Sequence, residues 1–277
     1  MSTWNRGEAE SWADAMSYAL VQHYGSWTGP DTVVVDDIAE QLALSLQPAD
    51  GRARSDAPAQ DHLQRWLAVR ESVPWHEIPD DGADGPVAPL RDGAAEDIRA
   101  FDGAVDPARA QGLLSALELA RADAARGARL DFALLSSWQR HVLGAPQPPR
   151  FRTLPAFAKG SRERYGSGSD TPARFDACLA ESACDVGRPL GLTARAARAY
   201  LDVCFFLPST TATPASAFLA LVFVLALVGI ALDGVGLLRR VTFEADAPQD
   251  PLILVRYING HLAETRRRSA DSAGSAR

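Results

Sequence analysis

This chain has few lysines and cysteines, and its basic residues do not outnumber its acidic ones. Lys159 is the only lysine among 277 residues, and 35 aspartates and glutamates outnumber 28 lysines and arginines, which gives a net charge of −7. Because nucleic-acid binding needs a basic surface, this balance argues against a nucleic-acid partner. The three cysteines, Cys178, Cys184 and Cys204, lack the paired spacing of a metal site and are typical of a reducing cytoplasm.

Signatures of the common enzyme classes and of export are also missing. The five histidines are His23, His62, His76, His141 and His261. They occur in no HExxH or similar metal-binding spacing, so we predict surface or boundary residues rather than ligands. The polar segment 1–10 lacks the apolar core of a secretory signal, so we expect a cytoplasmic location. What the chain does have is apolar residues, 47% of the total, which excludes pervasive disorder.

One long segment carries no charge. No charged residue occurs between Asp202 and Asp233, and residues 217–232 are almost all leucine, valine, alanine, phenylalanine and isoleucine. A bilayer-spanning helix needs about 20 apolar residues, so a single-pass membrane protein is one interpretation. Pro208 and Pro214 shorten the apolar part. We therefore favour the central helix of an all-α bundle, which is apolar on every side because neighbouring helices surround it.

Helical periodicity dominates the rest of the chain and predicts an all-α fold. The predicted helices are 12–24, 36–46, 61–74, 107–126, 130–143, 172–183, 193–206, an apolar helix from Pro214 to Gly234 and Gly236, and 251–268. Proline-rich and glycine-rich segments at 48–60 and 79–89 predict loops. We expect an N-terminal helical region with such linkers (1–105), a second domain (106–268) and a disordered tail (269–277).

The loop between the helices 193–206 and 217–232 is rich in hydroxyl groups. It reads LPSTTATPA from Leu207 to Ala215 and lies at a helix N-terminus. Free backbone N–H groups and the helix dipole favour an anion there. Serine and threonine are also common capping residues, and simple capping of the helix is the alternative.

The order of these elements resembles the Fic/Doc (Fido domain) family. The resemblance covers about residues 110–265 and includes LLSSWQRHVLG at a helix end, RFRTLPAFAKG, TARAARAYLDVCFF, a nine-residue loop and the apolar helix. In that family the loop reads His-Pro-Phe-x-(Asp/Glu)-Gly-Asn-(Gly/Ala)-Arg. The resemblance implies a Fic-like helical bundle with a β-hairpin flap, and transfer of AMP from ATP, with Mg²⁺, to a hydroxyl of a target protein. The histidine is then the general base, the carboxylate holds the metal, and the remaining groups bind the phosphates.

When the family pattern is aligned with residues 207–215 without gaps, most residues differ from it. The base position is Leu207, the metal-carboxylate position is Thr211 and the phosphate-arginine position is Ala215. The other positions of the nucleotide-binding loop are Pro208, Ser209, Thr210, Ala212 and Thr213. Leucine accepts no proton and alanine pairs with no phosphate, so the chain as written is predicted to be inactive. The alternative is a non-catalytic protein-interaction module.

The lost signature has a simple explanation at the level of the gene. Many arginines and a single lysine are typical of GC-rich coding DNA. In such codons Pro-Phe-Asp-Asp-Gly-Asn-Ala-Arg is CCC TTC GAC GAC GGC AAC GCC CGC. Begun one base later, the same bases read CCT TCG ACG ACG GCA ACG CCC GC and encode residues 208–215. We therefore hypothesise two compensating frameshifts, one base lost near codon 207 and one regained near codon 216.

The segment FRTLPAFAKGSRERYGSG predicts a small β-hairpin, with Gly160 and Gly166 at turns. By the resemblance it is the flap that aligns a target protein by strand addition, through Arg152, Thr153 and Leu154. Strand addition needs an exposed edge with free backbone groups. An ordinary surface hairpin is the alternative.

Overall fold

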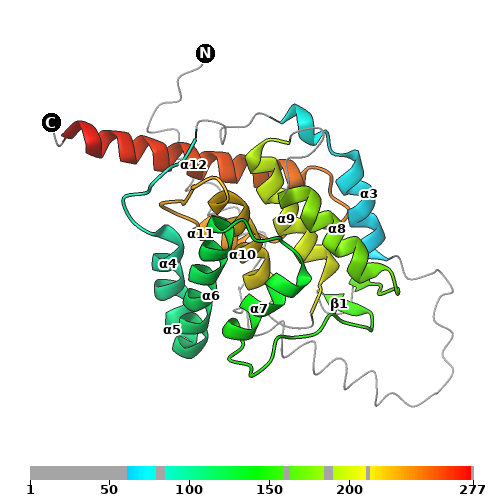
Figure 1. The fold of residues 1–277 in the computed structure, drawn as a ribbon. Coiled ribbons are helices and arrows are strands. Elements are labelled where there is room, and N and C mark those ends of the chain that lie inside the picture. The colour runs from blue at the N-terminus through cyan, green and yellow to red at the C-terminus, as the bar shows by residue number, and fades with distance from the viewer. Residues whose placement is uncertain (1–60, 79–84, 159–162, 184–189, 210–212, 276–277) are drawn as a thin grey trace, which may run out of the picture. The chain divides into compact units, whose positions relative to one another are not determined.

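The computed structural model describes residues 61–78, 85–158, 163–183, 190–209 and 213–275 (Figure 1). The chain divides into two compact units, Met1–Pro48 and Ala49–Arg277, and all described residues belong to the second. The predicted helices 12–24 and 36–46 and the predicted loop 48–60 lie outside the described residues.

The described residues form helices and one small hairpin, as the sequence predicts. The helices are α3 (His62–Ser72), α4 (Gly93–Asp97), α5 (Gly103–Val105), α6 (Pro107–Ala125), α7 (Phe132–Val142), α8 (Thr171–Ala183), α9 (Leu192–Phe206), α10 (Thr213–Ala226), α11 (Gly236–Arg240) and α12 (Asp250–Ser275). A 3₁₀ turn, η1 (Trp75–Glu77), follows α3, and a π-helical turn, η3 (Ile98–Asp102), joins α4 to α5. The strands are β1 (Ala156–Ala158) and β2 (Glu163–Tyr165).

Aspartate side chains begin several of these helices. Asp106 accepts a hydrogen bond from the Arg109 backbone N–H (3.0 Å), and Pro107 occupies the first helical position of α6. This confirms the helix start that the Asp-Pro pair predicts. The same type of cap is made by Asp61 for α3, Asp92 for α4 and Asp131 for α7. Each cap stabilises its helix by about 1 kcal/mol.

The apolar helix α10 is at the centre of the described unit. It packs against α9, α6 and α7, and every side chain from Ala217 to Leu225 is at most 8% exposed. Trp138 of α7 stacks on Phe223, with ring centroids 5.6 Å apart. The helix is therefore apolar on all sides because other helices surround it, as the favoured interpretation predicts. Within the described residues, no helix has the length and apolarity required to cross a bilayer.

The end of α10 differs from the prediction. The helix ends at Ala226, so the expectation that it continues to Gly234 and Gly236 is wrong. Gly229 has a positive φ of 73°, and its backbone N–H donates to the carbonyl of Ala226 (3.0 Å). Glycine adopts this left-handed conformation without a Cβ clash, so it ends the helix. Ile230 and Leu232, which follow it, are buried in an irregular segment instead.

The last helix is longer than predicted. α12 runs to Ser275, so the expectation that it ends at Arg268 is wrong. Glu264 pairs with both Arg267 and Arg268 at 2.7 Å, and Arg267 also pairs with Asp271 (3.4 Å). Charge pairs three or four residues apart favour a continuing helix, and the pair between Arg267 and Asp271 extends across the predicted end at Arg268.

The short helices between residues 93 and 105 are not apparent in the sequence pattern. They depend on contacts with α11, because Arg239 pairs with both Asp97 and Asp102 (2.6 Å to Asp102) and Arg240 pairs with Asp97 (2.7 Å). Elements this short are stabilised by tertiary contacts rather than by their own propensity.

A buried polar network joins α3 to α9. Asp202 is fully buried and accepts hydrogen bonds from the indole N–H of Trp66 (3.0 Å) and from Nε of Arg70 (2.9 Å). Arg70 reaches Glu181 of α8 as well (3.0 Å). Burial raises the pKa of Asp202, and the positive charges of Arg70 and Arg198, with the hydrogen bonds from Arg70 and Trp66, oppose this shift. The network therefore offsets the free-energy cost of burying the Asp202 carboxylate.

Candidate functional site

The loop between α9 and α10 begins with a strained residue. Leu207 has φ 44° and ψ 60°, the left-handed conformation, directly after α9 ends at Phe206. For a bulky residue this conformation costs about 1–2 kcal/mol and persists only where neighbouring contacts hold it. The structure describes the loop to Ser209 and again from Thr213. Thr210, Thr211 and Ala212 lie outside the described residues.

The described start of the loop is anchored in the core. The Ser209 hydroxyl is buried and accepts a hydrogen bond from the side-chain amide of Gln139 (2.6 Å). Gln139 belongs to α7 and is only 2% exposed. Buried polar groups of this kind are stable only when they are paired. The loop is thus tied to a helix far from it in sequence.

The N-terminus of α10 has the polarity for an anion but lacks catalytic side chains. The first backbone N–H groups of a helix have no partner within the helix and carry partial positive charge. Among the described loop residues, 207–209 and 213–215, no side chain is a histidine, a carboxylate or an arginine. Ser216, in the first turns of α10, has a buried hydroxyl with no hydrogen-bond partner. This arrangement can accept a negative group but cannot take a proton from a nucleophile.

The predicted hairpin is present. β1 and β2 are antiparallel, with Ala156 opposite Tyr165 and Ala158 opposite Glu163. The far side of β2 makes a bridge between Arg164 and Asp61, whereas among the described residues β1 has no strand on its other side. Within the described residues, β1 is therefore the edge of the sheet without a strand partner, and its three residues are half-buried.

The three predicted flap residues fall into two groups. Thr153 and Leu154, which precede β1, are exposed, Leu154 to 74%. Arg152 is buried, and its side chain points into the protein rather than toward a target. Its guanidinium donates only to backbone carbonyls among the described residues, those of Phe206, Leu207, Leu154, Tyr165 and Gly166. Burial lowers the pKa of Arg152 to about 10, so the side chain is still a cation at neutral pH.

A titratable pair beside the hairpin was not suggested by any sequence motif. The hydroxyl of Tyr165 donates to the carboxylate of Glu163 (2.7 Å), and both residues are buried on one face of β2. Burial and the neighbouring carboxylate raise the pKa of Tyr165. The ring of His62 lies 5.7 Å from that of Tyr165. Glu163 and Tyr165 are two residues apart on one strand, so the sequence alone could have placed them on the same face of the hairpin. Only the fold shows that this face is buried.

The cysteines and histidines form no metal site in the described part of the chain. No group of three or more histidine, cysteine, aspartate or glutamate side chains there could hold a metal ion. Cys178 and Cys204 are free thiols, and burial raises the pKa of each to about 12. Thiols of this kind are poor nucleophiles at neutral pH. Cys184 and His23 lie outside the described residues.

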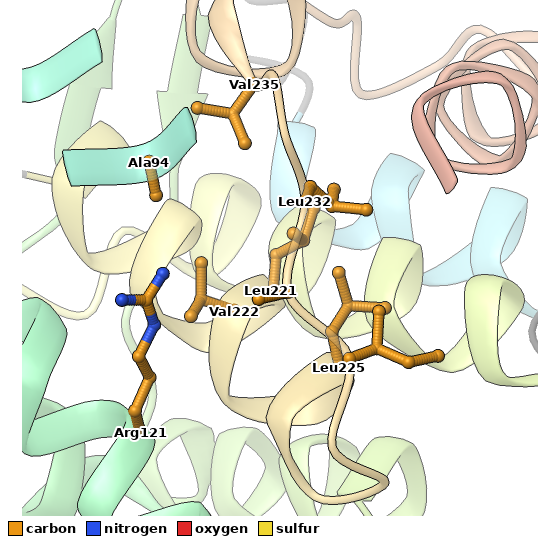
Figure 2. A pocket seen from close by; sticks show the side chains of 9 residues that line it. Ala94, Arg121, Leu221, Val222, Leu225, Leu232 and Val235 are labelled. Atoms are coloured by element: carbon orange, nitrogen blue, oxygen red, sulfur yellow. The ribbon is translucent and has the colours of Figure 1, made fainter. Parts of the chain in front are cut away.

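A small cavity beside α10 is too narrow for a ligand. Figure 2 shows its lining: Leu221, Val222 and Leu225 of α10, Leu232 and Val235 of the following segment, Arg121 of α6 and Ala94 of α4. Its volume is about 10 Å³, roughly the space of one water molecule. Arg121 is already paired with Asp92 (2.6 Å). The loop and the hairpin, rather than this cavity, form the candidate site.

Neither a scan of protein-family models nor a search of curated proteins found a match to this chain.

Proposed function

We propose that this chain has a Fic-type fold of the protein AMP-transferase lineage and that, as written, it has lost the catalytic groups. Such an enzyme would need two features side by side: a loop that binds nucleotide phosphates and an edge strand that aligns the target hydroxyl. The element order, the all-round burial of α10 and the hairpin all support the proposal.

The contact between hairpin and loop is the observation that carries it. The backbone N–H of Arg152 donates to the carbonyl of Pro208 (3.0 Å), and its guanidinium reaches Phe206 and Leu207. The segment leading into β1 thus lies directly against the loop start, although the two are far apart in sequence. A target strand on β1 would lie next to the α10 N-terminus, the place that suits a phosphate.

The residues present do not fit the metal or the chemistry of the family reaction. That reaction needs a base to take the proton of the target hydroxyl and a carboxylate to hold Mg²⁺ beside the phosphates of ATP. Position 207 is a leucine, position 211 a threonine and position 215 an alanine. The chain as written therefore lacks the side chains that this transfer step requires.

The test is to restore the loop and look for AMP transfer. The repaired chain carries Leu207→His, Ser209→Phe, Thr210→Asp, Thr211→Asp, Ala212→Gly, Thr213→Asn, Pro214→Ala and Ala215→Arg. Both chains are incubated with Mg²⁺ and ATP labelled at the α-phosphate, so that a hydroxyl of the chain itself is the acceptor of AMP and pyrophosphate is released. We expect labelled protein only with the repaired chain, because it alone has the base, the metal ligand and the arginine. Circular dichroism and thermal melting establish that both chains are folded.

ATP labelled at the γ-phosphate is the matched control. AMP transfer leaves the α-phosphate on the protein and releases the γ-phosphate in pyrophosphate, so the γ-label should not be incorporated. A folded repaired chain that incorporates no α-label would contradict the proposal.

A non-catalytic interaction module is the second candidate. It is favoured by the edge of β1 that has no strand partner among the described residues and by the exposed side chain of Leu154 near it. An extended peptide that binds both chains, with label in neither, would support this candidate over a broken enzyme.

A further inference from the structure

Arg152 is unusual because it is a buried cation held by carbonyl groups. Its side chain uses Nε and both terminal nitrogens, at 2.8–3.3 Å from their acceptors. The five N–H groups of a guanidinium are all engaged by this set of contacts. Asp61 is the acid that most favours its charge, and Arg164 opposes it.

The acceptors belong to two separate parts of the fold. The carbonyls of Phe206 and Leu207 are at the open C-terminal end of α9, where the last carbonyls of a helix have no partner. The carbonyls of Leu154, Tyr165 and Gly166 are in the hairpin and its flanks. One side chain therefore connects the hairpin to the first residue of the loop.

This connection also explains the strained conformation of Leu207. The Leu207 carbonyl accepts from Nε of Arg152 at 2.8 Å, and the next carbonyl, that of Pro208, accepts from the Arg152 backbone N–H at 3.0 Å. Two consecutive carbonyls are thus fixed by one residue. A left-handed leucine needs such support, because its isolated cost is about 1–2 kcal/mol.

We propose that Arg152 is a positioning residue that couples the hairpin to the end of α9 and the first loop residues, 207 and 208, so that opening either one loosens the other. Its relevance to catalysis rests on the proposed function, whereas the coupling is a property of this fold. In the repaired chain the same contacts would hold the flap in register with the nucleotide loop.

Arg195 provides a matched control within the same chain. It is also buried, and its guanidinium donates to the carbonyls of Ser182 (3.1 Å) and Ala183 (2.8 Å) at the end of α8. Ser182 and Ala183 both lie at the C-terminal end of α8, outside the hairpin. Arg195→Met thus removes a comparable buried arginine without touching the proposed coupling. Arg150→Met removes an exposed arginine next to the site.

The test is amide hydrogen exchange of the full chain, without nucleotide. In Arg152→Met we expect exchange to rise about 10-fold or more in both the hairpin strands and the last turn of α9, with α6 and α10 unchanged. Arg195→Met and Arg150→Met should leave both segments at the wild-type rate. Arg152→Lys, which keeps the charge but has three donors, should give the same paired increase, and it replaces Arg152→Met if that variant does not fold.

A rescue experiment separates positioning from general loss of stability. Millimolar guanidinium added to Arg152→Ala should slow exchange in both segments together, and ammonium at the same concentration should not. Faster exchange in the hairpin alone, or equally across α6 and α10, would overturn the coupling. Because no labelling is measured, a repaired chain that fails to transfer AMP contradicts the proposed function and leaves this result standing.

Discussion

Asp202→Asn should lower the free energy of unfolding by about 3–5 kcal/mol. Asp202 is fully buried and pairs with Arg70 at 2.9 Å, while Trp66 donates to the same oxygen. Asparagine is the same size, but it leaves the buried cation of Arg70 without its main counter-charge. Denaturant unfolding followed by circular dichroism measures the change, read from the midpoint at constant slope.

Two further variants test whether the lower free energy of unfolding comes from the unpaired buried charge. Asp271→Asn removes a carboxylate of the exposed pair with Arg267 and should leave the unfolding midpoint unchanged. The double variant Asp202→Leu with Arg70→Met should lose less than the sum of its single changes, because apolar replacement of both partners leaves no buried charge. A loss below about 1 kcal/mol in Asp202→Asn would show that the network does not hold α3 against α9.

A chain repaired at every loop position except Leu207 should transfer AMP about 10²–10⁴-fold more slowly than the fully repaired chain. Leucine cannot accept the proton of the target hydroxyl, while the metal ligand and the phosphate arginine are still restored. Initial rates of α-label incorporation at saturating ATP measure the difference.

Thr210 supplies the control for that series. Its position is variable in the family pattern, so a repaired chain that keeps Thr210 should label at a similar rate to the fully repaired one. Equal rates with and without Leu207 would mean that position 207 is not the base, and the alignment of the family pattern on 207–215 would then be wrong.

Much of the fold could be predicted because its signals are local. The Asp106–Pro107 pair marks the start of α6, and an apolar stretch without charge predicts the buried α10. Two short segments separated by a glycine-containing turn predict the hairpin. Each of these predictions depends only on residues that are close together in the sequence.

The elements that the sequence did not predict depend on contacts with residues far away in the sequence. The turns around 93–105 are held by Arg239 and Arg240, which come after α10 in sequence. Several glycines could have ended α10, and the sequence does not distinguish Gly229 from Gly234, since apolar residues continue between them.

The role of Arg152 could not be predicted from the sequence either. Its side chain binds carbonyls from the hairpin and from the end of α9, and backbone carbonyls have no sequence signature. An arginine beside exposed residues looks like part of a docking surface until the fold shows that it is buried. Thr153 and Leu154, its neighbours, are exposed as a docking surface requires.

The coding DNA tests most directly the hypothesis that codons 208–215 encode the family signature displaced by one base. We expect codons 208–213 to be CCT, TCG, ACG, ACG, GCA and ACG, and codon 207 to end in C, so that reading from one base earlier gives Pro-Phe-Asp-Asp-Gly-Asn. Serine at 209 encoded by anything but TCG, or threonine at 210, 211 or 213 encoded by anything but ACG, would contradict it. The signature would then never have been present in this loop.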